Sequence, residues 1–255
     1  MMDLNGVAAL VTGAGSGMGA ATAKTLAERG ARVAVIDLNL ESAQQTADSI
    51  KGLALSADVS SGASVEAALQ QVVDELGTPR VVVSCAGIAA ASRIVGREGP
   101  HELDLYQRVI NVNLVGTFNV LRLAADRMST LEPVSKSGAR GVIVNTASVA
   151  AYEGQIGQAA YSSSKGGVVA LTLPAARELA RFGIRVMTVA PGLIGTPMLL
   201  NMPDDVQQSL AGQVPFPQRF GTPEEFADLV LHIVDNEMLN GEVIRFDGAI
   251  RLQPK

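Results

Sequence analysis

The sequence of 255 residues has no tryptophan, one cysteine, two histidines and few aromatic residues of any kind. A single cysteine, Cys85, excludes an internal disulfide and a thiolate metal cluster. His101 and His232 have no partners at the spacing of metal ligands or of a catalytic triad. We therefore expect no metal site, and we interpret both histidines as structural.

Long hydrophobic runs and clusters of positive charge are also missing. No apolar run reaches the roughly 18 residues of a membrane-spanning helix, and no two basic residues are adjacent. Together with a net charge of -5, this argues against a nucleic-acid surface or a polybasic membrane anchor. The first strand-like segment begins by Val7, so we expect no targeting peptide. The composition predicts a soluble, cytoplasmic protein with no nucleic-acid or membrane partner.

Small aliphatic residues are abundant instead, and apolar residues make up 47% of the chain. Seven short apolar runs alternate with segments of helical spacing. Because parallel neighbours are joined by crossover helices, this alternation predicts a doubly wound, parallel, seven-stranded α/β sheet with helices on both faces. No linker interrupts it, so we expect one domain over residues 1–255. The predicted strands are 7–13, 31–37, 52–58, 80–87, 141–148, 184–192 and 242–248.

Three long irregular segments, 88–101, 129–140 and 193–222, stand out from this alternation. In open α/β sheets ligands bind beyond the carboxyl ends of the strands, where the first and third segments begin. The third segment contains a stretch of helical character, 203–213. We predict that it is a lid over the substrate; the alternative is a rigid surface excursion.

The stretch "TGAGSGMG", residues 12–19, lies between the first predicted strand and the first predicted helix. Glycines at 13, 17 and 19 allow a tight turn and a close approach to a pyrophosphate at the helix N-terminus. The alternative is a junction that uses glycine for packing alone. The position between a strand and a helix favours a dinucleotide site.

Asp37, at the end of the second predicted strand, indicates which dinucleotide binds. A carboxylate at this place can accept both hydrogen bonds of a ribose diol, and it repels a 2′-phosphate. The neighbours Ser16, Leu38 and Asn39 are not basic. NAD is therefore favoured over NADP, although a helix N-cap remains an alternative role for Asp37.

Two further residues lie at the predicted cofactor edge. Asp58 ends the third strand, where it could receive the adenine amino group, or it could be an exposed loop aspartate. Cys85 lies in an apolar strand, so we interpret it as a small core residue whose backbone borders the cofactor rather than as a reactive thiol.

The stretch "YSSSK" suggests a catalytic pair, because it places Tyr161 and Lys165 one helical turn apart. A free tyrosine has a pKa of about 10, and a nearby ammonium lowers that pKa by favouring phenolate. Such a phenolate could take the proton of an alcohol as hydride leaves for a nicotinamide. Ser148 ends the fifth strand and could bind the substrate oxygen. The alternative is that Tyr161 and Lys165 are both ordinary surface residues. We interpret Tyr152 in this way, because the residue four positions after it is Ile156, which is not basic.

Together, "TGAGSGMG", "CAG", "VNL", Ser148 and "YSSSK" resemble the short-chain dehydrogenase/reductase family over essentially the whole chain. Each motif is weak, but their order and separations are jointly specific. The resemblance implies a Rossmann-like fold and a catalytic tetrad of Asn113, Ser148, Tyr161 and Lys165. Asn113, rather than Asn111, matches the family position before leucine, and its implied role is to hold a helix backbone open so that a water connects Lys165 to solvent.

The resemblance also implies that "PGLIGTPM" binds nicotinamide, and we expect Gln155 and Gln158 to shape the substrate pocket. One departure is that Ser84-Cys85-Ala86-Gly87 replaces the family's common Asn-Asn-Ala-Gly, which puts a side-chain tie across the sheet in question. The expected cofactor-binding residues are Gly13, Ser16, Gly17, Met18, Asp37, Asp58, Val59, Cys85, Gly87, Tyr161, Lys165, Ile194 and Thr196.

Within the family, "RVMTVAPGLIGTPML", "QVPFPQR" and "NGEVIRFDGAIR" resemble members that act on acyl-CoA thioesters. This resemblance implies NAD-dependent conversion of (S)-3-hydroxyacyl-CoA to 3-ketoacyl-CoA, a role in fatty acid metabolism and a homotetramer. A hydroxysteroid, a sugar alcohol or ketoacyl reduction is an alternative within the family. A non-catalytic NAD-binding scaffold is the alternative from another class, and the complete tetrad argues against it.

Overall fold

The computed structural model describes residues 2–254 and, for Met198, only the backbone. All seven predicted strands are present, each somewhat shorter than its predicted range because the flanking turn residues leave the sheet. The strands are β1 (Ala8–Thr12), β2 (Arg32–Asp37), β3 (Leu53–Ser56), β4 (Val81–Ser84), β5 (Gly141–Thr146), β6 (Ile184–Pro191) and β7 (Val243–Phe246).

The strands form one parallel sheet in the order β3-β2-β1-β4-β5-β6-β7. The predicted doubly wound sheet is therefore confirmed, and its connections change direction between β1 and β4. At this point Thr12 pairs with Ser84, and Ser84 pairs with Asn145. The carboxyl ends of the central strands consequently lie together at one edge, where this fold places its ligands.

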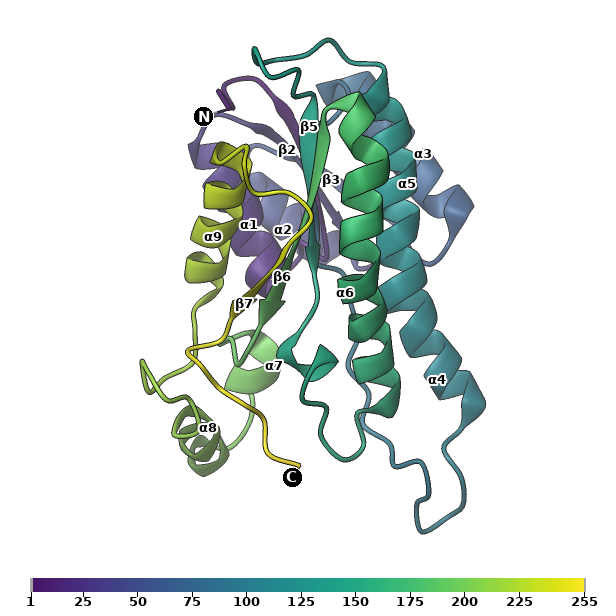
Figure 1. Cartoon of the computed structure of the whole chain (residues 1–255), viewed down its shortest axis with the longest axis vertical. Helices are drawn as coiled ribbons and strands as arrows, with labels where there is room; N and C mark the ends of the chain where they lie inside the picture. The colour runs from purple at the N-terminus through teal and green to yellow at the C-terminus, as the bar shows by residue number, and fades with distance from the viewer. Residues whose placement is uncertain (1, 255) are drawn as a thin grey trace.

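Helices cover both faces of the sheet (Figure 1). A core of aliphatic side chains fills the space on each face, and the central strands are buried throughout. No helix within residues 2–254 is both long and apolar enough to cross a bilayer. One face carries α1 (Gly17–Glu28), α2 (Leu40–Ile50) and α9 (Pro223–Asp235), and the other carries α3 (Gly62–Leu76), α4 (Leu103–Ile110), α5 (Gly116–Ser129) and α6 (Ala159–Leu179).

The path from α4 to α5 contains a turn of π-helix, η1 (Asn111–Val115). Its backbone is wider than an α-helix and leaves the regular hydrogen-bond ladder, as π-turns at functional sites commonly do. Two short 3-10 helices follow later in the chain, η2 (Val149–Ala151) and η3 (Ala180–Phe182). The widened turn places Asn113 on the side of the helix that faces α6, where it contacts Ser164.

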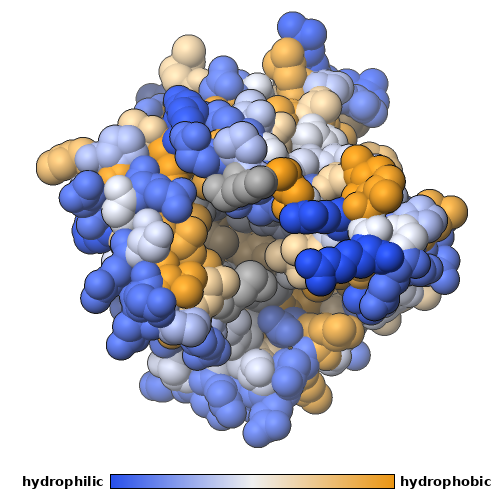
Figure 2. Space-filling model, turned by 90° about the horizontal axis from the view of Figure 1, so that it is seen from below, coloured by the Kyte–Doolittle hydropathy of each residue, from blue (hydrophilic) through white to orange (hydrophobic). Residues whose placement is uncertain are grey.

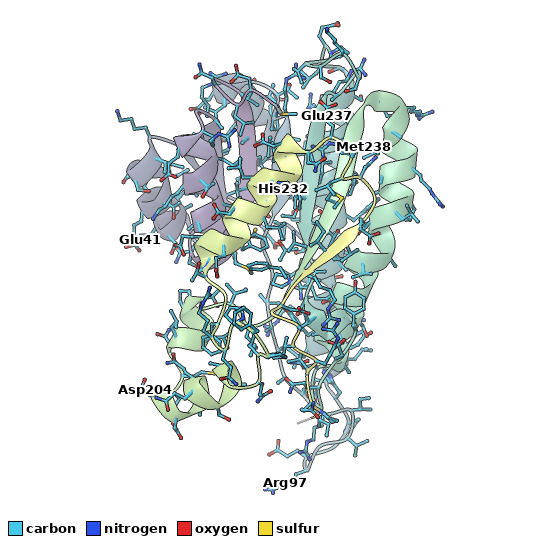
Figure 3. All side chains as sticks on the ribbon, turned by 60° about the vertical axis from the view of Figure 1, so that its left-hand side comes forward. Glu41, Arg97, Asp204, His232, Glu237 and Met238 are labelled. Carbon is cyan, nitrogen blue, oxygen red and sulfur yellow. The ribbon has the colours of Figure 1, made fainter. Side chains whose placement is uncertain are left out.

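The irregular segments divide between the two ends of the molecule. Residues 88–101 and 193–222 extend from the carboxyl edge of the sheet, with Arg97 at the tip of the first and Asp204 on the second (Figure 3). The second contains α7 (Pro197–Leu200) and α8 (Asp204–Ala211), so the helical stretch predicted there is confirmed. Residues 129–140 lie at the opposite end, where Ser137 donates to Glu237. Whether 193–222 moves as a lid stays a prediction.

Candidate active site

A cleft of about 650 Å³ opens at the carboxyl edge of the sheet. Figure 2 looks onto this face and shows it hollowed at its centre, with hydrophobic and hydrophilic residues around the opening. The turn after β1, the ends of β2, β4, β5 and β6, and the start of α6 form its walls. The predicted site residues that line it are Gly13, Ser16, Gly17, Met18, Asp37, Cys85, Gly87, Ser148, Gln155, Gln158, Tyr161, Lys165, Ile194 and Thr196.

Three predicted site residues do not line this cleft. Asn113 lies behind its wall, since a β-carbon at Gly87 would be 3.2 Å from the Asn113 Oδ1 atom. The Asp58 carboxylate accepts hydrogen bonds from the backbone and hydroxyl of Ser60, at 2.9 and 2.7 Å. Val59 is buried in the core beside α3 and α5. The cofactor contacts of Asp58 and Val59 stay predictions.

The turn between β1 and α1 is tight in the way that the glycine pattern predicts. Gly13 and Gly17 have φ values of 62° and 52°, in the left-handed region that favours glycine. A β-carbon at Gly13 would lie 2.6 Å from the Ala86 backbone, and one at Gly19 would lie 2.2 Å from the Gly13 carbonyl. The bare backbone and the N-terminus of α1 therefore fit the pyrophosphate of a dinucleotide.

Asp37 borders the same end of the cleft. Its two carboxylate oxygens accept the backbone N–H groups of Gly15 and Asn39, at 2.9 and 3.0 Å. These bonds hold the side chain at the end of β2, directly beside the glycine turn. A carboxylate in this place fits the diol of an adenosine ribose.

Ser148 and Tyr161 meet at the other end of the cleft. Burial raises the pKa of the Tyr161 phenol above its ordinary value, and a hydrogen bond with Ser148 acts in the opposite direction. The Ser148 oxygen also accepts the backbone N–H of Ala150 at 3.1 Å, which fixes the hydroxyl at the start of η2. The two hydroxyls therefore share a small region in which one substrate oxygen could contact both.

Lys165 lies one helical turn beyond Tyr161, as predicted, with its Nζ atom 5.8 Å from the centre of the tyrosine ring. This ammonium donates to the Thr146 carbonyl at 2.7 Å, and burial lowers its pKa to about 8. We expected Lys165 to lower the pKa of Tyr161. In the structure the pKa of Tyr161 is raised, because removal of the phenol from water outweighs the hydrogen bond with Ser148. The lowering by Lys165 stays a prediction.

Asn113 joins three parts of the site from behind. Its amide oxygen accepts the backbone N–H of Ile88 at 2.8 Å, and its amide nitrogen donates to the Ile88 carbonyl at 2.9 Å. The same nitrogen donates to Ser164 at 3.0 Å, and Ser164 donates to the Tyr161 carbonyl at 2.7 Å. Asn113 thus holds the loop after β4 against the first turns of α6.

Of the two residues that depart from the common family pattern, Ser84 forms no side-chain hydrogen bond across the sheet in the described part of the chain, whereas Cys85 forms one. Ser84 and Asn145 are paired in the sheet, but their polar side-chain atoms make no hydrogen bond within residues 2–254. Thr146 instead donates to the Cys85 sulfur at 3.6 Å. Burial raises the pKa of Cys85 to about 11, so the thiol is protonated at neutral pH, as expected of a core residue.

Sequence reasoning missed part of the cleft wall. The loop after β4, the loop after β6 and the end of the chain contribute apolar side chains there. Their course depends on contacts with distant segments, and they carry no periodicity or motif that could have marked them. The missed lining residues include Ile88, Ala89, Ala90, Ala91, Leu199 and Leu252.

Comparisons with known proteins define the class. The sequence model of the family described as short chain dehydrogenase matches residues 7–207. The chain therefore belongs to the short-chain dehydrogenase family, and it is an oxidoreductase that uses a nicotinamide cofactor.

Individual relatives are similar over their full lengths. The chain is 54% identical to the 3-hydroxyacyl-CoA dehydrogenase type-2 of Bos taurus and 52% identical to that of Homo sapiens, over 99% of this chain and 98% of each relative. The crystal structure of 3-hydroxyacyl-CoA dehydrogenase type-2 from Mycobacterium avium is 42% identical, with a TM-score of 0.94 over 98% of both chains.

Proposed function

We propose that this chain is an NAD-dependent 3-hydroxyacyl-CoA dehydrogenase that interconverts (S)-3-hydroxyacyl-CoA and 3-ketoacyl-CoA. The observation that carries the proposal is the arrangement of Ser148, Tyr161 and Lys165 at the end of a cleft whose other end fits a dinucleotide. High identity to relatives named for this activity supports the substrate class. The S hand follows the sequence resemblance described above.

NAD, rather than NADP, is proposed from Asp37. The turn from Gly13 to Met18 would hold the pyrophosphate, Asp37 the adenosine ribose, and Ile194 and Thr196 the nicotinamide carboxamide. When bound, the cofactor supplies the acceptor or donor of hydride. A 2′-phosphate would meet the Asp37 carboxylate, which already accepts two backbone N–H groups.

Tyr161 is proposed to exchange the proton with the substrate oxygen, which Ser148 orients. Because the pKa of the phenol is raised, Tyr161 is protonated at neutral pH and ready to donate to the oxygen of a ketone. In the reverse direction it takes the proton of the alcohol. Acid–base catalysis of this kind typically contributes about 10²–10⁴-fold to the rate.

Lys165 and Asn113 are proposed to support this proton transfer. The Lys165 ammonium favours phenolate when Tyr161 loses its proton, and its pKa of about 8 suits proton exchange near neutral pH. Asn113 positions α6 and the loop after β4, as its bonds to Ser164 and Ile88 indicate. Gln155 and Gln158 are proposed to contact the substrate from the segment between Ser148 and Tyr161.

We further propose that residues 1–255 form one NAD-binding domain that assembles as a homotetramer and acts in fatty acid metabolism in the cytoplasm. The continuous sheet of seven strands supports the single domain. Family resemblance supports the assembly and the metabolic role, and composition supports the compartment.

The test is NADH absorbance with acetoacetyl-CoA at neutral pH. We expect NADH, and not NADPH, to be consumed, and Tyr161→Phe to lose at least about 10²-fold in kcat. Tyr152→Phe is the matched control, because Tyr152 lies outside the cleft, and it should retain activity within a few-fold. In the oxidative direction the (3S)-hydroxybutyryl thioester should react and the (3R) form should not. Absence of turnover although NADH binds would reject the thioester and lead to a panel of hydroxysteroids and sugar alcohols.

A further inference from the structure

The end of the chain forms part of the cleft. After β7 the backbone runs along the loop that precedes α6, and Leu252 lines the cleft together with Gln155 and Gln158. In Figure 1 this tail, residues 248–254, is drawn in yellow and descends from β7 toward the lower edge of the molecule. Because Gln155 and Gln158 lie between Ser148 and Tyr161 in the chain, Leu252 belongs to the substrate end of the cleft.

The start of the tail is held by a tight turn. The backbone N–H of Ile250 donates to the Asp247 carbonyl at 3.0 Å, and that of Ala249 donates to the Asp247 carboxylate at 2.9 Å. The Ile250 side chain is only 1% exposed. It packs beside Gly192, where a β-carbon would lie 3.3 Å from the Ile250 Cγ2 atom. The tail therefore begins from a fixed position.

Four charged residues fix the tail immediately before Leu252. We call Glu153, Arg245, Asp247 and Arg251 the tail cluster. Arg245 donates to both carboxylate oxygens of Glu153, at 2.7 and 2.9 Å, and to Asp247 at 2.7 Å. Arg245 and Arg251 both donate to the Ile250 carbonyl, at 3.0 and 2.7 Å. Bidentate and charge-assisted bonds of this kind restrict geometry strongly.

The tail is also fixed immediately after Leu252. The Gln155 side-chain nitrogen donates to the Gln253 carbonyl at 3.0 Å, and the backbone N–H of Ile156 donates to the Pro254 carbonyl at 3.0 Å. Gln155 is itself held, because its backbone N–H donates to the Gln158 side chain at 3.0 Å. Leu252 thus lies between two anchored stretches, and its position in the wall is rigid.

We propose that Leu252 limits the length of the acyl chain that the cleft accepts, an inference that rests on the proposed function. Leu252 and Leu199 both line the cleft, and their apolar side chains suit a hydrocarbon chain. The pantetheine arm, with its amide groups, would leave polar atoms unpaired against them. Because the tail is anchored on both sides of Leu252, the wall does not retreat when a longer chain enters.

The experiment compares two substrates in the wild type and two variants. We would measure kcat/KM with NADH for acetoacetyl-CoA and 3-ketododecanoyl-CoA in wild type, Leu252→Ala and Leu252→Phe. Leu252→Ala should raise the ratio of long-chain to short-chain kcat/KM by about 10-fold, and Leu252→Phe should lower it by a similar factor, because a few methylene groups in an apolar pocket change binding on this scale. The change should appear in KM for the long substrate, with kcat for acetoacetyl-CoA nearly constant.

Two controls distinguish a steric effect of Leu252 on chain length from a general loss of activity. Leu40→Ala makes the same chemical change at the start of α2, outside the cleft, and should keep the wild-type ratio. Leu252→Met preserves the side-chain volume and should also keep it. Thermal unfolding and NADH binding by fluorescence verify that each variant is folded.

An unchanged ratio in Leu252→Ala and Leu252→Phe, or an equal loss with both substrates, would overturn the role of Leu252 while leaving the proposed function intact. Failure of the wild type to act on either thioester, with NADH bound, would overturn both.

Discussion

One polar cluster lines the cleft and a second holds the tail that reaches it, and the two have opposite effects on the pKa of the cation that they contain. In the proposed catalytic cluster, formed by Ser148, Tyr161 and Lys165, the buried ammonium donates to an uncharged carbonyl and its pKa falls to about 8. In the tail cluster, the Arg245 guanidinium lies between the carboxylates of Glu153 and Asp247, which raise its pKa. Lys165 can therefore lose its proton near neutral pH, whereas Arg245 stays protonated.

The difference follows from what each cluster has to do. A buried charge without an opposite charge destabilises the folded state, because it has lost its hydration. Within residues 2–254 no carboxylate forms an ion pair with Lys165, whereas Arg245 satisfies its donors with two carboxylates and a carbonyl. We therefore expect Lys165 to lower stability and Arg245 to raise it, as is common where a site is kept for chemistry.

The largest effect should come from Lys165→Met. We expect kcat with acetoacetyl-CoA to fall about 10²–10⁴-fold, while the free energy of unfolding rises by about 1–3 kcal/mol because a buried charge has been removed. Steady-state kinetics and urea denaturation measure the two changes. Lys24→Met, on the exposed side of α1, is the control and should alter neither. If Lys165→Met were less stable than the wild type, Lys165 would stabilise the fold, and the two clusters would not differ in this respect.

The free energy of unfolding should also depend on pH because of the buried Lys165. The pKa of Lys165 is about 8 in the folded protein, against an ordinary value of 10.5, so between these values the unfolded chain binds more protons than the folded one. The free energy of unfolding should therefore rise with pH from about 8 to about 10.5, by up to about 3 kcal/mol. The quantity to measure is the difference between wild type and Lys165→Met, which cancels other titrating groups. A difference that does not change with pH would contradict the lowered pKa.

Arg245→Met should have a smaller effect of the opposite kind. The Arg245 side chain is 22% exposed, so the loss is less than for a fully buried pair, and we expect the free energy of unfolding to fall by about 2 kcal/mol. Activity on acetoacetyl-CoA should stay within a few-fold. Arg177→Met, on the exposed side of α6, supplies the reference in urea denaturation. Equal destabilisation by both substitutions would mean that the tail cluster contributes nothing specific.

The fold could be predicted because its signals are local. Each strand is an apolar run bounded by turn residues, and the glycine stretch at 12–19 marks the first crossover directly. The spacing of Tyr161 and Lys165 is likewise a property of one helix, which the structure places as expected. The ends of the strands were less accurate, because residues such as Cys85 continue the apolar run after sheet pairing has stopped.

The rest of the site depends on contacts between distant segments. Leu252 reaches the cleft because contacts between segments far apart in the sequence, such as those of Arg245 with Glu153 and of Gln155 with Gln253, hold the tail in place. The raised pKa of Tyr161 depends on how completely the surrounding elements exclude water. Spacing along a helix reports which groups are close, and it does not report how dry their surroundings are.

The π-turn at Asn111–Val115 has a consequence for how this chain can vary. It is equivalent to one residue inserted into an otherwise regular helix that joins α4 and α5. The wider turn absorbs this extra residue, so α4 and α5 keep the alignment of a regular helix. Without the widening, the extra residue would rotate α5 by about 100° relative to α4. Val120 would then leave the core, or Asn113 would leave Ile88 and Ser164. The irregular turn therefore keeps both helices aligned with their partners, so we expect a further insertion at this turn to disturb one of them.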